Sequence, residues 1–301
     1  MTDISSSKQP SESNKQLRRL QLLKKSGIFD GLPEDLICKR ATTAQEHREA
    51  FNLVYQSYID NNYILPNKSE MRVRLWETFP QNGTFICKDS EKVVGVTGTV
   101  MDNTSLLLPS DHAFHDELNQ MRDDGAVLCE ISNQAVASEY RNTPVTTELM
   151  CAAFGHAWFS ECTDLVCAVS PKQRNFFSLM GFEQVGDIKS YSDIVHDPVA
   201  LLRMPHIQDR YSPGKPGDPT INEFWNRLFI TGNPYIPVFP LWQRMVDMLF
   251  ASPHAIQTMY EGCTELFEDL DANERRILEQ NLGTSFRYIL PEYAKENTID
   301  I

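Results

Sequence analysis

A glutamate inside an apolar run is the residue of this chain best suited to acid–base chemistry. Glu130 lies in the stretch Val127-Leu-Cys-Glu-Ile-Ser132, which has the composition of a buried strand. Burial raises the pKa of a carboxylate toward neutrality, where the group can remove a proton from a substrate. We therefore assign Glu130 as a general base. The alternative is a surface or salt-bridged glutamate.

Strand periodicity predicts which side chains accompany this glutamate. Residues two positions apart in a strand share a face, so we expect one face to carry Leu128, Glu130, Ser132, Gln134 and Val136. Backbone amides near Ala135 to Ala137, at the end of the same strand, are the candidates to polarise a substrate carbonyl.

A loop and a long helix follow this strand and form a candidate anion site. A helix N-terminus presents unpaired amides and the positive end of the helix dipole. Val136 and Arg141 match the spacing of V-x-x-x-x-[QR]-x-x-G-x-[GA], the GNAT acyltransferase signature that holds the diphosphate of coenzyme A. Pro144 and Thr146 replace its two glycines, and proline has no amide to donate. The expected acyl-donor residues are Val136, Arg141, Thr143, Val145 and Thr146; for Arg141 the alternative is a surface arginine.

A second segment resembles the GNAT motif that ends in Y-x-x-x-G-F. It runs Ser170-Pro-Lys-Gln-Arg-Asn-Phe-Phe-Ser-Leu-Met-Gly-Phe182, with Phe177 at the position of the tyrosine that commonly acts as general acid. Phenylalanine cannot protonate a leaving thiolate.

Helix and strand patterns alternate between Leu36 and Met204. The expected elements are a strand at 36–41, a helix at 43–58 opened by a Thr43-x-x-Glu46 capping box, a helix at 68–78, strands at 84–88 and 93–101, a helix at 113–122, a strand at 126–137, a helix at 143–160, a strand at 165–169, a helix at 172–180 and a closing strand pair. This order predicts an α+β fold with a mixed, mostly antiparallel central sheet flanked by helices.

Composition divides the chain into three parts. We expect a disordered or basic N-terminal segment at 1–35, with disorder over 1–14 and a basic helix from Lys15 to Lys25. That helix packs its leucines on the main domain, or contacts a membrane or an acidic partner. An acyltransferase-like domain follows at 36–205. Residues 206–301 comprise a Pro/Gly/Asp-rich linker at 209–222 and a helical C-terminal extension with aromatic anchors at Phe224, Trp225, Phe229, Trp242, Phe250, Tyr260 and Phe267.

Overall composition limits the classes of function. The 301 residues are 41% hydrophobic and 23% charged, with a net charge of −13, which disfavours nucleic acid as a partner. The N-terminus lacks the apolar region of a signal peptide, and the seven cysteines form no CxxC pair, so we expect a reduced, cytoplasmic protein. His112 and His115 have no third residue at ligand spacing, so no metal site is expected.

The segment from Leu53 to Leu202 resembles the long-chain N-acyl amino acid synthases, which are GNAT-fold relatives of the acyl-homoserine lactone synthases. The resemblance covers about half the chain. It rests on Leu53-Val-Tyr-Gln-Ser-Tyr-Ile-Asp-Asn-Asn-Tyr-Ile-Leu-Pro66, Met71-Arg72, Val93-Val-Gly-Val-Thr-Gly-Thr-Val-Met-Asp102, Phe114-His-Asp-Glu-Leu-Asn-Gln-Met-Arg122, Cys129-Glu-Ile-Ser132, Gly181-Phe-Glu-Gln-Val-Gly-Asp-Ile-Lys-Ser-Tyr191 and Pro198-Val-Ala-Leu-Leu202.

The resemblance implies transfer of a fatty acyl group from an acyl carrier protein to the α-amine of an amino acid. No permanently bound cofactor is implied: acyl-phosphopantetheine on the carrier, or acyl-CoA, is the co-substrate. Carrier-bound pantetheine has one phosphodiester in place of a diphosphate, which fits the weakened loop. Tyr63, Arg72 and Ser132 are the implied substrate residues, and for Tyr63 and Arg72 the alternative is a structural role. Lys172 and Arg174 are the candidates for carrier docking, together with Arg141.

Two departures from the family pattern affect what the resemblance implies about the acceptor and about the turnover rate. Asn133 and Gln134 replace a basic and an apolar residue of E-x-S-R-F-x-V, and Phe176-Phe177 replaces an aromatic pair that ends in tyrosine. Two further hypotheses therefore remain beside the carrier-dependent enzyme. One is a GNAT that uses acetyl- or acyl-CoA on a small amine, and the other is a catalytically silent module that binds a lipid or a partner.

Overall fold

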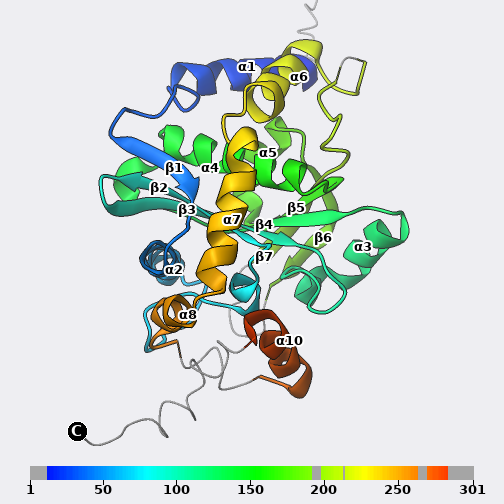
Figure 1. The fold of residues 1–301 in the computed structure, drawn as a ribbon. Helices are drawn as coiled ribbons and strands as arrows, with labels where there is room; N and C mark the ends of the chain where they lie inside the picture. The colour runs from blue at the N-terminus through cyan, green and yellow to red at the C-terminus, as the bar shows by residue number, and fades with distance from the viewer. Residues whose placement is uncertain (1–11, 192–197, 213, 264–269, 284–301) are drawn as a thin grey trace, which may run out of the picture.

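The computed structural model describes residues 12–191, 198–212, 214–263 and 270–283, built around one seven-stranded sheet (Figure 1). The strand order is β1-β2-β3-β4-β5-β7-β6, and all neighbours are antiparallel except β4 and β5, which are parallel. The expected mixed, mostly antiparallel sheet is confirmed. The strands are β1 (Leu36–Arg40), β2 (Gly83–Asp89), β3 (Lys92–Met101), β4 (Leu128–Val136), β5 (Asp164–Val169), β6 (Glu183–Ser190) and β7 (Pro198–Met204).

Helices cover both faces of the sheet. On one face α4 packs on β1, β2 and β3, and on the other face α2 packs on β2, β3 and β4. Figure 1 shows α1 and α6 outside the layer of α4 and α5, while α8 lies beyond α2. The α-helices are α1 (Glu12–Lys25), α2 (Ala44–Asp60), α3 (Asp111–Asp123), α4 (Pro144–Phe159), α5 (Arg174–Leu179), α6 (Pro219–Asn226), α7 (Phe239–Phe250), α8 (Pro253–Tyr260) and α10 (Ala272–Leu282). Short turns of helix are η1 (Leu75–Thr78), η2 (Ser138–Tyr140), η3 (Pro171–Gln173), η4 (Arg227–Thr231) and η5 (Ile236–Val238).

Helix α4 is the centre of the largest hydrophobic cluster. Thr143 caps it, Pro144 occupies its first position, and eleven of its sixteen residues are buried. A helix that is apolar all round must be covered on every side. The sheet covers one side of α4, while Leu20 of α1 and Trp225 of α6 belong to the same cluster on its outer side.

The C-terminal helices share this core with the rest of the chain. The indole Nε1 of Trp225 donates to the Leu179 carbonyl at 3.0 Å, and the Trp225 side chain is buried. Helix α7 runs from the α4 side of the sheet to the α2 side (Figure 1). Buried Arg40, at the end of β1, donates to Gln243 of α7 at 2.7 Å. The extension is therefore packed against the sheet through several elements.

The helix expected at 68–78 is largely wrong. Only Leu75–Thr78 is helical, as a single 3-10 turn. Upstream, the side chains of Asn67 and Ser69 satisfy the backbone of Met71, at 2.8 and 3.2 Å, in place of helical hydrogen bonds. Glu70 adopts a positive φ of 53°, which a helix does not allow.

Other boundaries need smaller corrections. Thr43 caps α2 by accepting from the Glu46 amide at 3.2 Å, but the Glu46 carboxylate accepts from Thr42 and Lys39, so the reciprocal half of the capping box is absent. The linker expected at 209–222 ends earlier, because α6 begins at Pro219. Expected disorder over 1–14 is wrong for residues 12–14, which belong to α1. Residues 1–11 and Phe267 lie outside the described residues.

Proteolysis tests the attachment of the C-terminal extension. A protease that cuts between Asp209 and Thr220 should leave both pieces associated on a sizing column, because separation would expose Trp225, Phe229 and Phe239. Recovery of a stably folded C-terminal piece on its own would show instead that the extension is an independent domain.

Candidate active site

The central cavity of the molecule opens where β4 and β5 separate. Their parallel pairing ends at Glu130 and Val166, after which β4 continues beside β3 and β5 beside β7. A cavity of about 190 Å³ lies at this point. It is lined by Tyr58, Tyr63, Arg72, Arg74, Glu130, Ile131, Ser132, Asn133, Gln134, Cys167, Ala168, Val169, Ser170, Gln173, Phe177, Tyr191, Pro198 and Val199. The cavity thus brings together four residues expected from sequence: Tyr63, Arg72, Glu130 and Ser132.

A β-bulge changes the direction of side chains along β4. Asn133 and Gln134 stand opposite the single residue Thr97 of β3, and Asn133 has a positive φ of 47°. Leu128, before the bulge, packs with the cluster that includes Phe114 of α3, whereas Val136, after it, packs with the α4 cluster. The expectation that one face carries every second residue from Leu128 to Val136 is therefore wrong beyond Ser132.

Glu130 lies at the base of the cavity and is 2% exposed. Its Oε2 accepts the backbone N–H of Ser110 at 2.9 Å and the Ser110 hydroxyl at 2.6 Å. Burial raises the pKa of Glu130 to about 7, although the Ser110 hydrogen bonds and the positive charge of Arg74 act in the opposite direction. A carboxylate with this pKa exchanges protons readily near neutral pH.

Ser110 is held in place by the start of α3. It is the residue that precedes α3, and it is fully buried. Arg122, near the other end of the helix, donates to Asp111 at 2.6 Å and to Asp102 at 2.7 Å. These ion pairs fix the N-terminus of α3 against β3, and with it the two donors that face Glu130.

The ion pair between Arg74 and Glu77 supports another part of the cavity wall. Arg74 Nη2 lies 2.6 Å from Glu77 Oε1 and also donates to the Ser132 hydroxyl at 3.1 Å. Asn133 Nδ2 donates to the same Glu77 oxygen at 2.9 Å. Burial acts to lower the pKa of Arg74, but its contact with Glu77 raises that pKa above the ordinary value. This network orients the two residues of β4 that follow Glu130 and Ile131.

Arg72 has a different environment, because no carboxylate of the described residues pairs with its guanidinium. It lies 5.1 Å from the centre of the Tyr58 ring, and among the same residues its buried Nε has no hydrogen-bond partner. Burial lowers the pKa of Arg72, and the nearby positive charge of Arg74 lowers it further. Tyr63 packs edge-on against Tyr58, with ring centres 5.7 Å apart. An anion in the cavity would give the Arg72 guanidinium its missing partner.

The expected acyl-donor residues lie outside the lining of this cavity, on the loop after β4 and at the start of α4. Arg141 is exposed, and its Nε donates to the Val136 carbonyl at 3.2 Å. Pro144 has no amide, and Thr143 Oγ1 accepts the amide of Val145 at 3.4 Å. Val145 itself is buried. Thr146, the third residue of α4, therefore has the amide that remains without an intrahelical or capping partner in the first turn.

The backbone amides near the end of β4 divide into two groups. Ala137 donates its N–H to the Val94 carbonyl of β3 at 2.9 Å. Hydrogen-bonded pairs alternate along an antiparallel ladder, so Ala135 also faces β3, and the N–H of Val136 between them faces the gap toward β5. Of the amides of Ala135, Val136 and Ala137, that of Val136 is therefore the one available to a bound acyl donor.

The segment after β5 forms the remaining wall. Phe177 is buried and packs edge-on against Phe182, with ring centres 5.3 Å apart. Gln173 lines the cavity between Lys172 and Arg174, which are both exposed. Arg174 Nη1 donates to Gln184 at 2.6 Å. A hydroxyl is supplied to this cavity by Tyr191, whose pKa burial raises well above its ordinary value.

Sequence reasoning missed the residues that act through Glu130 and Ser132. Ser110 contacts Glu130 across twenty residues of sequence, and Arg74 and Glu77 contact β4 across more than fifty. No local pattern signals such contacts. Tyr58 and Tyr191 lie in the segments that resemble the synthase family, and that resemblance was the available signal.

Two absences apply to the described residues. Among them, no group of three or more His, Cys, Asp or Glu side chains is arranged to hold a metal ion. Likewise, within residues 12–191, 198–212, 214–263 and 270–283, no helix has the length and apolar character needed to cross a membrane.

Comparison with known families identifies the kind of enzyme. Residues 49–205, slightly more than half of the chain, match the family model of FeeM, an N-acyl amino acid synthase. The chain belongs to this family. It is accordingly an acyltransferase, and the matched residues include β4, the cavity and the start of α4. The hypothesis of a catalytically silent module is set aside.

One of the similar solved structures shares the fold, and two others are similar to a lesser degree. The structure of FeeM, an N-acyl amino acid synthase from uncultured soil microbes, is 22% identical, with a TM-score of 0.51 over 58% of this chain and 93% of that chain. A CoA-dependent acyl-homoserine lactone synthase, BjaI, is 12% identical, with a TM-score of 0.42 over 63% and 83%. An N-acetyltransferase from Staphylococcus aureus Mu50 is 13% identical, with a TM-score of 0.40 over 57% and 98%. A comparison with curated proteins gives no match.

The buried ion pair beside the cavity yields a stability prediction. Arg74→Met should lower the free energy of unfolding in urea by about 3–5 kcal/mol, because it leaves the Glu77 carboxylate buried without its partner. The double variant Arg74→Met/Glu77→Gln should recover part of that loss. Arg276→Met, on the exposed face of α10, is the control and should change stability by less than about 0.5 kcal/mol. Equal losses in the two arginine variants would contradict the structural role of the pair.

Proposed function

We propose that this acyltransferase moves a fatty acyl group from an acyl carrier protein thioester to the α-amine of an amino acid, with Glu130 as general base. The observation that carries the proposal is the position of Glu130. Its carboxylate is buried, has a pKa of about 7, and lies where the two central strands separate around a cavity.

The reaction can be written with the residues of the cavity. Glu130 takes a proton from the acceptor amine, whose nitrogen forms a bond to the thioester carbonyl carbon. We assign the Val136 N–H as the group that donates a hydrogen bond to a carbonyl oxygen of the acyl thioester. When the carbon–sulfur bond breaks, the thiolate takes the proton that Glu130 has held. Phe177 has no proton to give, so this shuttle supports turnover without a tyrosine at that position.

The charges around the cavity favour an amino acid as the acceptor. The Arg72 guanidinium lines it and is largely buried, and among the described residues its Nε has no hydrogen-bond partner, which suits an α-carboxylate. Ser132, held by Arg74, and Tyr63 lie on the same cavity and are the other acceptor residues. Glu130 then receives the amine, because the carboxylate and amine of an α-amino acid project from adjacent atoms.

The start of α4 favours a carrier protein as donor. Pro144 has no amide and Thr143 caps the Val145 amide, so of the first three positions of α4 at most Thr146 has an amide to offer a donor. One amide together with Arg141 suits the single phosphodiester of carrier-bound phosphopantetheine better than the diphosphate of coenzyme A. Lys172 and Arg174 are exposed beside the cavity residue Gln173, where a docked acidic carrier would meet them.

The pH dependence of the rate tests the assignment of Glu130. Glu130→Gln should reduce acyl transfer by about a hundredfold or more with little loss of stability. In the native protein kcat/KM should fall about tenfold per pH unit below pH 7, where the carboxylate is protonated.

Ser110 provides the matched control for this profile. Its hydrogen bonds lower the pKa of Glu130, so Ser110→Ala should shift the profile to higher pH, and Ser110→Thr, which keeps the hydroxyl, should not. A Glu130→Gln variant with an unchanged rate would remove Glu130 from the mechanism.

Donor competition tests the second half of the proposal. The carrier thioester should react with a higher kcat/KM than the coenzyme A thioester of the same acyl chain. Pro144→Ala restores an amide at the start of α4 and should improve the use of the coenzyme A thioester more than that of the carrier thioester.

Charge reversal supplies the complementary arm. Lys172→Glu/Arg174→Glu should weaken the carrier-dependent reaction, as added salt should. Equal use of both donors by the native protein, with no effect of the charge reversal, would overturn the assignment of the donor.

A further inference from the structure

Helix α1 separates its apolar and basic side chains onto opposite faces. Leu20 is 2% exposed and belongs to the α4 cluster, and Leu17 and Leu23 pack against the same cluster. These leucines recur three residues apart, which places them on one side of the helix. The opposite side is therefore turned away from the core.

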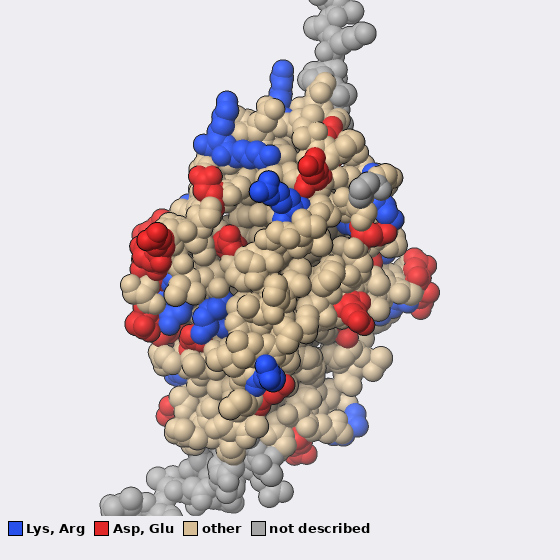
Figure 2. All heavy atoms as spheres, turned by 45° about the horizontal axis from the view of Figure 1, so that its top comes forward, with Lys and Arg blue, Asp and Glu red and all other residues tan. Residues whose placement is uncertain are grey.

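That outer side carries a stripe of positive charge. We define the basic face as four basic residues at helical spacing together with the leucine between them: Lys15, Arg18, Arg19, Leu22 and Lys25. Leu22, in the middle of the stripe, is 67% exposed. Helix α1 holds five basic residues and one acidic residue in a chain whose net charge is −13. Figure 2 shows Lys and Arg side chains standing out at the upper end of the molecule, where α1 lies.

Three charges of the basic face have no opposite charge beside them within the described part of the chain. Arg18, Arg19 and Lys25 form no ion pair there with an Asp or Glu. An acidic partner would supply the counter-charges for these three side chains.

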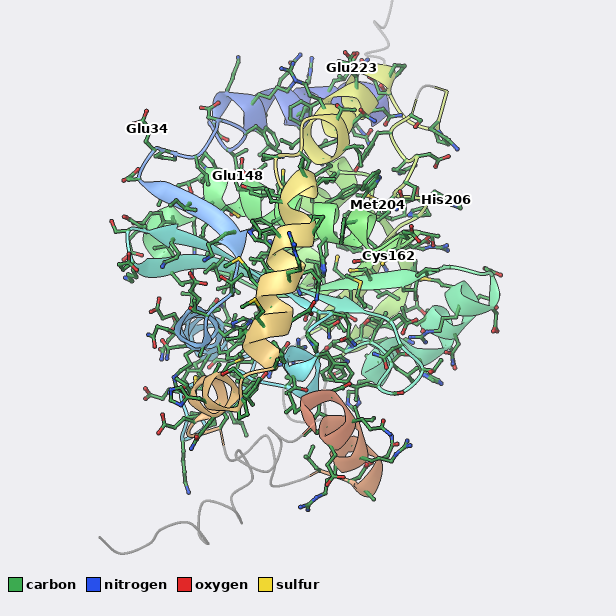
Figure 3. The ribbon with its side chains drawn as sticks, in the orientation of Figure 1. Glu34, Glu148, Cys162, Met204, His206 and Glu223 are labelled. Carbon is green, nitrogen blue, oxygen red and sulfur yellow. The ribbon has the colours of Figure 1, made fainter. Side chains whose placement is uncertain are left out.

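The position of α1 relates this face to the acyl-donor site. Thr147, in the first turns of α4, donates its hydroxyl to the Ile28 carbonyl just after α1, at 2.7 Å. Helix α1 also contacts α5. In Figure 3 the labelled Glu148 of α4 lies directly below the end of α1. Helix α1, which carries the basic face on its outer side, thus adjoins the two helices whose N-termini flank the proposed route of phosphopantetheine.

We propose that the basic face of α1 is a docking surface for the acidic carrier protein that presents the acyl thioester. This proposal rests on the proposed function. Residues 12–25 lie outside the residues 49–205 that match the FeeM family model. Charge complementarity selects an acidic protein, and the exposed Leu22 gives that protein an apolar contact at the centre of the face.

The test compares a donor that has a protein surface with one that has none. Arg18→Glu/Lys25→Glu should raise the KM for the acyl carrier protein thioester by about tenfold or more and leave kcat nearly unchanged. Turnover of the acyl-pantetheine thioester of the same chain, which carries no protein, should not change. The control is Arg244→Glu/Arg276→Glu, an equal charge change on exposed residues of α7 and α10, which should leave both donors unaffected.

The outcomes separate this proposal from the donor assignment. A native protein that prefers the coenzyme A thioester contradicts the proposed function. A native protein that prefers the carrier thioester, with an unchanged KM in Arg18→Glu/Lys25→Glu, overturns the docking surface alone. An equal loss with acyl-pantetheine also overturns it, because α1 would then act on the fold. The docking surface is also overturned if the variant loses binding to phosphatidylglycerol vesicles while its KM for the carrier is unchanged, because the face would then contact a membrane.

Discussion

The parallel pairing of β4 with β5 ends at Glu130 and Val166, and the active site depends on this end point. Past it, each strand keeps its outer neighbour, β3 or β7, so the sheet stays intact while its middle opens. The inner backbone groups on both sides of the gap then lack strand partners, which is costly for buried peptide groups. An extended donor with its own amides, such as pantetheine, can supply those partners as an added strand does.

Charge is distributed unevenly around this opening. Arg74 and Glu77 neutralise each other and act as scaffold, whereas within the described residues neither Glu130 nor Arg72 contacts an oppositely charged side chain. In the proposed function these two groups meet the two charged ends of an α-amino acid, Glu130 its ammonium and Arg72 its carboxylate. The cavity would then combine one ion pair that adds rigidity with two separated charges that recognise the acceptor.

Local patterns were sufficient for the elements with strong periodicity. The strands, α2 and α4 are predictable from sequence, because alternation, capping and an apolar run are properties of neighbouring residues. The roles of Glu130 and Arg141 stay predictions. The stretch 67–74 is not predictable in this way, because side chains of Asn67 and Ser69 replace helical bonds there. The bulge at Asn133 and the contact of Ser110 with Glu130 depend on other strands and helices, and single-sequence periodicity contains no information about them.

The burial of Glu130 has a consequence for the folded state as a whole. Its pKa is about 7 when folded and near 4.5 when the side chain meets water, so folding favours the protonated carboxyl. This contribution to stability is complete below about pH 4.5, declines as the pH rises, and is lost above pH 7, where it leaves a net penalty on the order of 3 kcal/mol relative to acid conditions. In the proposed mechanism, the ionised form that removes a proton is also the form that destabilises the fold. At alkaline pH the reaction should therefore be faster while the folded state is less stable. A change in the pKa of Glu130 that improves one of these two properties works against the other.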